Sequence, residues 1–205
     1  MSCASSAKSS GSKLRNLRPS DRPMDRAGKP RKLRNLSHMR YPTLSAAREL
    51  LFPLIRNNMA RLEPAPYYDD ERRGLERLDS TFTLMQRDEY PDDLSKAAYL
   101  FCSVIDGHFF SNGNKRLGVA VLTYFLIVNG WKISAPELSV MREELERFFP
   151  HLRWEEVSAF RHSHEYFFYH LALIVADRKQ KGTLNFREEQ KAVRELLAFI
   201  AFRSL

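Results

Sequence analysis

The sequence predicts a mainly α-helical protein, because apolar residues recur at helical spacing and proline and glycine residues stand between the apolar segments. The chain has 205 residues, of which 43% are hydrophobic. This length and composition are typical of one globular domain with an apolar core. We therefore expect one compact helical domain over residues 41–205, preceded by a tail of different composition.

The tail comprises residues 1–40, which contain 11 Lys or Arg and 2 Asp or Glu, a net charge of +9. The whole chain carries +8, so the remaining 165 residues carry −1. The tail is rich in Ser, Arg, Lys, Gly and Pro, and it cannot bury enough apolar surface to offset chain entropy. We expect a disordered basic tail, and a nucleic-acid partner is expected only through it.

The first half of the domain begins with a predicted helix over residues 43–62, in which Pro53 is expected to produce a kink. Pro64 and Pro66 end this helix. Residues 81–86 then alternate in the manner of a strand, so we expect a small hairpin within residues 69–90. A second helix is predicted to start at Pro91-Asp92-Asp93 and to stop at Gly107.

The second half is predicted to consist of helices. Residues 117–128 are apolar almost all round, as expected of a central helix, and Asn129-Gly130 ends it. Further helices are predicted at residues 135–149, 154–179 and 187–203. The longest apolar run is about half the length needed to cross a bilayer, and no membrane partner is expected. Cys3 and Cys102 form no disulfide framework, which favours a cytoplasmic protein.

One polar segment, residues 107–118, stands between the two most apolar helices. Burying polar groups there is costly unless they are used. Gly113 and the asparagines on either side of it allow a tight turn, so that backbone N–H groups converge at the start of the next helix. Lys115 and Arg116 add positive charge where a helix N-terminus already favours phosphate. The segment therefore predicts a cradle for a polyphosphate.

His108 precedes this cradle by five residues, and a histidine there could take a proton from an attacking hydroxyl at neutral pH. Phe110 is expected to point into the core and anchor the loop. The competing interpretation is a helix-loop-helix turn with a capping histidine.

The segment from His108 to Arg116 resembles the Fic/Doc signature, His-x-Phe-x-acidic-Gly/Ala-Asn-Gly/Lys-Arg. The resemblance covers about residues 74–131 and is greatest to Doc-like toxins. It implies a compact helical bundle with a β-hairpin flap that holds the target, here Thr81, Phe82, Thr83 and Leu84. It also implies catalysis by His108, a motif anchor at Phe110, and binding of ATP or another nucleoside triphosphate by residues 112–116, namely Asn112, Gly113, Asn114, Lys115 and Arg116.

The ending Asn114-Lys115-Arg116 resembles the Doc branch, which implies phosphate transfer to a hydroxyl of a target protein such as a translation factor. The second arginine of adenylylating relatives would fall at Val119. A small antitoxin is the partner that the resemblance implies. Transfer of a nucleotidyl group on the same fold remains an alternative.

Asn112 departs from the signature, because the family usually has an acidic magnesium ligand at this position. An amide oxygen is a weaker ligand for Mg²⁺ than a carboxylate. We expect magnesium with the nucleotide. A catalytically degenerate module that binds nucleotide or a partner remains the non-enzymatic alternative.

Overall fold

The computed structural model describes residues 39–59 and 63–203 of the chain. The predicted tail over residues 1–40 lies outside these ranges except for Met39 and Arg40, and the description below concerns the unit from Met39 onward. The described part is mainly helical with one small antiparallel sheet, which confirms the predicted fold class. None of its helices is both long and apolar enough to span a bilayer.

The first helical segment consists of three short pieces: α1 (Leu44–Ala46), the π-helix η2 (Ala47–Leu51) and α2 (Phe52–Asn58). Thr43 caps the start by accepting a hydrogen bond from the Ala46 N–H at 3.1 Å. Pro53 has no N–H and its ring crowds the carbonyl four residues earlier, which explains why regular α-helical bonding is interrupted just before it. The structure thus has a π-helical turn just before Pro53, where the sequence predicts a kink.

Residues 81–86 do not form a hairpin, so that prediction was wrong. After the short 3₁₀ turn η3 (Tyr68–Asp70), the chain forms the helix α3 (Arg72–Leu84). Leu75, Leu78, Phe82 and Met85 are all buried and recur every three or four residues. The Thr81 and Thr83 hydroxyls donate to carbonyls four residues earlier, at 2.9 and 3.2 Å. Burial of this helical stripe outweighs the β-propensity of the threonines.

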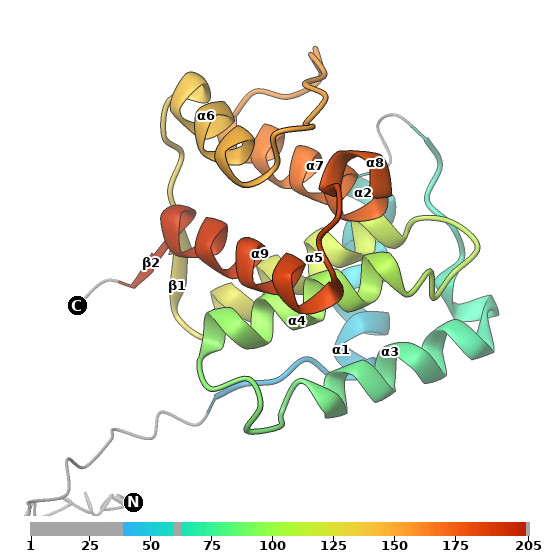
Figure 1. Ribbon diagram of the computed structural model, residues 1–205. Coiled ribbons are helices and arrows are strands. Elements are labelled where there is room, and N and C mark those ends of the chain that lie inside the picture. The colour runs from blue at the N-terminus through green and yellow to red at the C-terminus, as the bar shows by residue number, and fades with distance from the viewer. Residues whose placement is uncertain (1–38, 60–62, 204–205) are drawn as a thin grey trace, which may run out of the picture. The chain divides into compact units, whose positions relative to one another are not determined.

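The centre of the unit contains α4 (Asp93–Asp106), α5 (Asn114–Val128) and α9 (Phe186–Ile200). Asp92 caps α4 by accepting from the Ser95 N–H at 2.7 Å, and Gly107 ends it, as predicted. In Figure 1, α4 and α9 run side by side in front of α5, and both α5 and α9 pack on α4. Helix α5 also contacts α2 and α7, so it is surrounded by other helices, as its apolar sequence predicts.

The remaining elements differ from the prediction in their boundaries. They are β1 (Trp131–Ile133), α6 (Leu138–Phe148), α7 (Ser163–Ala176), α8 (Arg178–Lys181) and β2 (Ala201–Arg203). Strands β1 and β2 pair in antiparallel register, with Ile133 opposite Ala201, so the small sheet is not at the expected flap. The predicted helix over residues 154–179 was wrong for its first part, because residues 149–162 form a loop.

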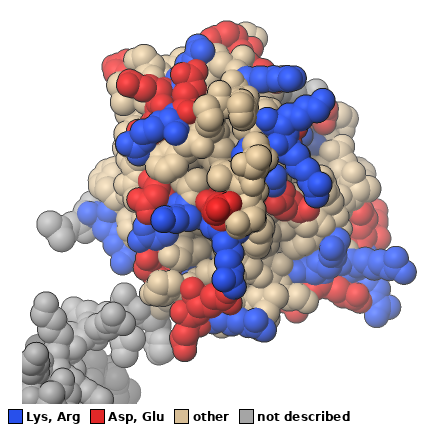
Figure 2. Space-filling view, viewed as in Figure 1, with Lys and Arg blue, Asp and Glu red and all other residues tan. Residues whose placement is uncertain are grey.

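The surface of this unit is electrostatically mixed. Figure 2 shows Lys and Arg side chains interspersed with Asp and Glu on the face that it presents. This distribution agrees with the near-neutral charge of residues 41–205 in the sequence. The described part therefore offers no broad single-sign field on this face.

Candidate functional site: the loop between α4 and α5

The candidate site is the loop of residues 107–113, which leaves the C-terminus of α4 and enters the N-terminus of α5. Gly107 closes α4, and its N–H donates to the Ser103 carbonyl at 3.0 Å. His108 then turns the chain with a φ of 44°. Among the described residues, no other residue except glycine has a positive φ. Histidine is one of the residue types that tolerate this region, but the conformation still carries backbone strain.

The His108 side chain is exposed, and within residues 39–59 and 63–203 no hydrogen bond or ion pair of its ring is present. This observation argues against the capping interpretation, since a capping ring would bond to nearby backbone. An exposed ring with both nitrogens available can exchange a proton with a bound molecule. The structure thus leaves His108 free for the role that the sequence predicts.

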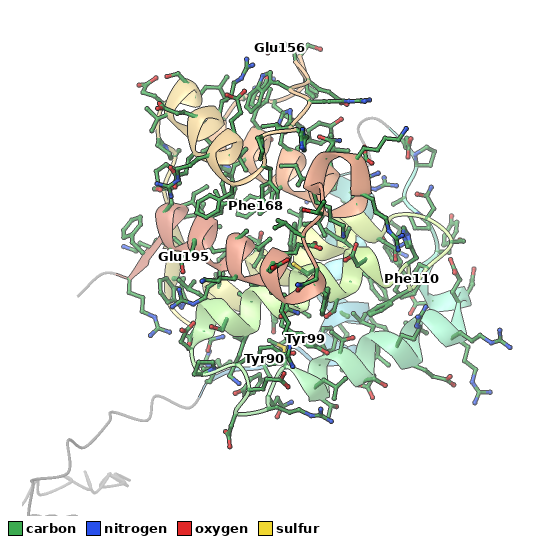
Figure 3. All side chains as sticks on the ribbon, in the orientation of Figure 1. Tyr90, Tyr99, Phe110, Glu156, Phe168 and Glu195 are labelled. Carbon is green, nitrogen blue, oxygen red and sulfur yellow. The ribbon has the colours of Figure 1, made fainter. Side chains whose placement is uncertain are left out.

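Phe110 anchors the loop in the core, as predicted, and is only 3% exposed. Its ring packs edge-on against Tyr68 at 4.9 Å between centroids and also contacts Phe52. A Cβ atom added to Gly74 of α3 would lie 2.6 Å from the Phe110 ring, so only glycine allows α3 to approach so closely. Figure 3 shows Phe110 on the side of the loop that faces α3.

Asn114 fixes the shape of the loop from inside. Its amide accepts from the Phe110 N–H at 3.0 Å and donates to the Phe110 carbonyl at 2.7 Å. Two hydrogen bonds between one side chain and one backbone residue lock their relative position. The sequence assigned Asn114 to phosphate binding, and the structure gives its side chain a structural role in the loop.

Gly113 adopts a left-handed conformation with φ 76° and immediately precedes α5. Its carbonyl accepts from the Tyr68 hydroxyl at 3.0 Å. Burial raises the pKa of Tyr68 to about 12, even though the nearby Arg116 charge opposes this, so the phenol keeps its proton and remains a donor. Gly113 is the N-cap residue of α5 and has no side chain that could accept from the first-turn N–H groups. The first-turn N–H groups of this long helix therefore remain available for an anion.

Asn112 and the two predicted cations occupy different environments. The Asn112 amide oxygen accepts from the Gly113 N–H at 2.5 Å. The Arg116 guanidinium donates to the carbonyls of Glu63 and Pro64 at 2.7 and 3.0 Å, so it tethers that segment to α5. Lys115 is exposed, and its ammonium makes no hydrogen bond within the described ranges. Lys115 is the cation that can most readily contact a ligand.

A site for magnesium built from the protein alone does not fit this loop. The described residues contain no group of three His, Cys, Asp or Glu side chains that could hold a metal ion. The Asn112 oxygen already accepts a hydrogen bond. Mg²⁺ prefers carboxylates and phosphates in octahedral geometry, and the loop supplies neither at Asn112.

Glu71 was not predicted, although it contacts the loop directly. Its carboxylate accepts from the Ser111 N–H at 2.8 Å and from the Ser111 hydroxyl at 2.7 Å. Tyr68 was missed in the same way. Both residues lie about 40 positions from their partners in the sequence, and no local pattern marks such contacts.

The four residues of the predicted flap lie in α3 and are exposed to different degrees. Thr81 and Phe82 are buried, Leu84 is half-buried and Thr83 is exposed. A hollow of about 530 Å³ lies beside them, between α3 and the loop, lined by Arg73, Glu76, Arg77, Ser80, Thr81 and Phe109. The Arg77 guanidinium lies over the Phe109 ring at 5.3 Å. The structure thus brings one flap residue, Thr81, to a hollow next to the loop.

Comparison with known proteins gives one match. No curated protein and no solved structure matches the chain. Residues 31–126 match the model of the Fic/DOC family. The matched range contains the whole loop and the helices α4 and most of α5 on either side of it. Residues 31–126 of the chain are therefore similar to the Fic/DOC family.

Proposed function

We propose that the chain is a Fic/Doc-type transferase that moves a phosphoryl group from ATP or another nucleoside triphosphate to a hydroxyl of a target protein. The observation that carries this proposal is the loop itself. It holds an exposed histidine on one side and the uncapped N-terminus of α5 on the other. A general base beside an anion site is what transfer from a triphosphate to a hydroxyl requires.

The chemistry assigns a role to each group. His108 takes the proton of the target hydroxyl, whose oxygen attacks the γ-phosphorus. The bond between this phosphorus and the oxygen that bridges to the β-phosphate breaks, and the nucleoside diphosphate leaves. The α5 first-turn N–H groups and Lys115 bind phosphate oxygens, while Asn114 and Phe110 keep the loop in shape. Magnesium would arrive with the triphosphate and supply charge neutralisation.

We propose that the target protein docks against α3, because the chain has no β-hairpin flap at residues 81–86. Phe109, which directly follows His108 in the sequence, lines the hollow together with Arg73 and Arg77. Glu76 also lines it but pairs with Arg72 at 2.8 Å. The remaining positive charge favours a target segment with acidic residues. Arg77→Gln is expected to raise the KM for the target about tenfold with little change in kcat, as loss of one ion pair at a docking surface would.

Resemblance to Doc-like toxins extends the proposal to a cytoplasmic toxin that modifies a translation factor and is held by a small antitoxin. Expression of the chain in a bacterial host would then arrest growth, and His108→Ala would remove the arrest. Equal toxicity of this variant would contradict the proposal, because the arrest would then not depend on transfer.

The decisive experiment is label transfer from ATP to proteins of a cell extract. We expect label from the γ position and not from the α position, and a loss of about 10²–10⁴-fold in His108→Ala. His151→Ala is the matched control, since His151 is also exposed but lies outside the loop. Label from the α position would instead identify nucleotidyl transfer.

Asn112 favours one alternative, a module that binds nucleotide without turning it over. Asn112→Asp separates the two. If magnesium binding limits the reaction, the carboxylate should lower the Mg²⁺ concentration needed for half-maximal transfer. If the wild type and this variant bind ATP in calorimetry but transfer neither label at any Mg²⁺ or Mn²⁺ concentration, the chain is a binding module.

A further inference from the structure

A cluster of three charged side chains connects the C-terminal helices to the candidate site. The Lys181 ammonium, at the end of α8, contacts both Asp106 carboxylate oxygens at 2.7 and 2.9 Å. It also contacts a Glu189 oxygen on α9 at 2.8 Å. The Lys181 and Glu189 side chains are 9% and 1% exposed. Three elements thus meet at one buried ammonium group.

The charges of this cluster do not balance when all three groups are ionised. Burial raises the pKa of Glu189 to about 7; the hydrogen bond from Lys181 opposes the rise and the Asp106 charge adds to it. The other Glu189 oxygen is buried, with no hydrogen-bond partner in the described part of the chain. The buried Cys102 thiol lies beside it, and its pKa is raised by burial and by the Glu189 charge. The ion pair of Lys181 with Asp106 is therefore the charge-balanced contact, and Glu189 is the surplus acid.

Asp106 is the last residue of α4, and it is followed directly by Gly107 and by His108 with its positive φ. A constraint on Asp106 therefore acts on the point at which the chain leaves the helix. Gly107 and His108 are otherwise held there by backbone hydrogen bonds of 3.0 and 3.4 Å, the second of which is long.

Helix α8 is itself fixed in place. Asp177 caps its start by accepting from the Lys179 N–H at 2.9 Å, and the Gln180 side chain accepts from the Arg153 N–H at 3.1 Å. Lys181 therefore extends from a supported backbone. Residues 178–189 also lie outside the range that matches the Fic/DOC family model.

We propose that Lys181 is a positioning residue for His108, and that it acts by holding the Asp106 carboxylate and so fixing the exit of the chain from α4. The proposal rests on the proposed function, in which His108 is the base. A histidine displaced by about 1 Å from its productive position can lose about 10²-fold in rate. Lys181 would thereby couple α8 and α9 to the reaction without touching a substrate.

The test uses the double variant Lys181→Met/Glu189→Gln in the full chain. It removes the ion pair with Asp106 without leaving Glu189 as an unpaired buried carboxylate, so the fold should survive. Glu189→Gln alone keeps the ion pair and reports the effect of the α9 carboxylate. Lys179→Met is the matched control, because Lys179 lies on the same short helix and is exposed.

Two readouts are compared. In the double variant, the kcat of label transfer should fall about 10–100-fold while the KM for ATP stays unchanged. In Glu189→Gln and in Lys179→Met, label transfer should stay at the wild-type level. Amide hydrogen exchange should accelerate at least tenfold at Gly107 and His108, while the core of α9 stays protected. The exchange measurement does not depend on catalysis.

The outcomes separate this proposal from the proposed function. If the wild type transfers no label, the proposed function fails, and exchange at Gly107 and His108 still shows whether Lys181 fixes this exit. If exchange at these two amides stays at the wild-type rate in the double variant, the positioning proposal is wrong. It is also wrong if Glu189→Gln alone lowers kcat as much as the double variant does.

Discussion

Two histidines of this chain, one within a loop and one beneath a loop, are in opposite environments. His108, in the loop between α4 and α5, is exposed and has a positive φ. His170, in α7, is fully buried under the loop of residues 149–162. The first ring is free among the described residues, whereas the second has a partner at each nitrogen.

The partners of His170 define its protonation state. Its Nε2 accepts from the Glu155 N–H at 2.9 Å, and its Nδ1 lies 2.8 Å from the Tyr166 carbonyl. A ring that accepts at Nε2 and donates at Nδ1 is neutral. The Trp154 ring stacks on it at 4.0 Å between centroids, nearly parallel. His170 is therefore a structural residue that holds the loop onto α7.

A structural histidine and a candidate base differ in burial and in the partners of the ring nitrogens. Burial, two satisfied nitrogens and aromatic stacking stabilise one protonation state, which suits structure. Exposure leaves the ring nitrogens of the other histidine accessible to a bound molecule, and backbone strain of this kind is concentrated at functional sites. Two alanine substitutions should therefore have opposite effects.

The largest expected effects come from His108→Ala and His170→Ala, measured together. His108→Ala should lower label transfer by about 10²–10⁴-fold and lower the free energy of unfolding by only about 1 kcal/mol, because alanine tolerates the positive φ of this exposed position less well than histidine. His170→Ala should lower the free energy of unfolding by about 2–4 kcal/mol, because the Glu155 N–H and the Tyr166 carbonyl each lose a partner and a cavity opens where the buried ring was. Urea denaturation followed by tryptophan fluorescence measures the second effect.

The control for this pair is transfer activity per folded molecule. His170→Ala should retain it, since the loop of residues 149–162 contributes no group to the proposed reaction. A loss of activity in folded His170→Ala as large as that in His108→Ala would show that the two loops are not independent.

A smaller effect is expected at Asn114, which distinguishes anchoring from ligand binding within the candidate site. Asn114→Ala should lower the free energy of unfolding by about 1–3 kcal/mol, because the Phe110 N–H and carbonyl are buried and would lose their partner. Asn114→Asp should also destabilise the fold, because its carboxylate keeps the acceptor for the Phe110 N–H but places an oxygen, rather than a donor, against the Phe110 carbonyl. Thermal or urea unfolding of the two variants measures the difference.

Lys115→Ala is the matched comparison for Asn114, because Lys115 is its exposed neighbour. This variant should leave stability unchanged and weaken ATP binding in calorimetry. If Lys115→Ala destabilises the fold and Asn114→Ala does not, the roles given to these two residues are reversed.

The sequence could predict those parts of the fold in which local signals agree with the tertiary structure. Asp92, Gly107 and the apolar stripe between them define α4, and the positions of His108 and Phe110 follow from the loop signature. In α3 the alternation of Thr81, Phe82 and Thr83 competed with the helical spacing of the buried residues. Packing of α3 against α4 stabilises the helix, and a contact between separate segments cannot be inferred from a few neighbouring residues.

The loop of residues 149–162 shows the second kind of limit. Its aromatic residues read as the start of a helix, but Trp154 instead stacks on His170 sixteen positions later. The hydrogen bond from the Ser111 hydroxyl to Glu71 was missed for the same reason, because it joins residues 40 positions apart. Contacts between distant segments determine both features, and neither leaves a periodic pattern.

The smallest expected effect is on the pH dependence of the free energy of unfolding, to which His170 and Glu189 contribute with opposite signs. Burial lowers the pKa of His170 below its ordinary value of 6.5, although the Tyr166 carbonyl and nearby carboxylates oppose this. The unfolded chain therefore binds a proton at this residue near pH 6.5 while the folded chain does not. Its contribution to stability is present above pH 6.5 and is lost as the pH falls below it, with a slope of at most about 1.4 kcal/mol per pH unit.

Glu189 acts in the opposite sense, because its pKa is raised from 4.5 to about 7 in the folded state. The folded chain binds the extra proton, so this contribution is present below pH 4.5 and is lost as the pH rises through 7. The two slopes overlap between pH 4.5 and 6.5 and partly cancel in the wild type. The free energy of unfolding of His170→Phe should therefore rise more steeply than that of the wild type as the pH falls from 6.5 to 5, whereas that of Glu189→Gln should decline more steeply. Identical pH profiles for the wild type and His170→Phe would show that folding does not lower the pKa of His170, which would contradict this prediction.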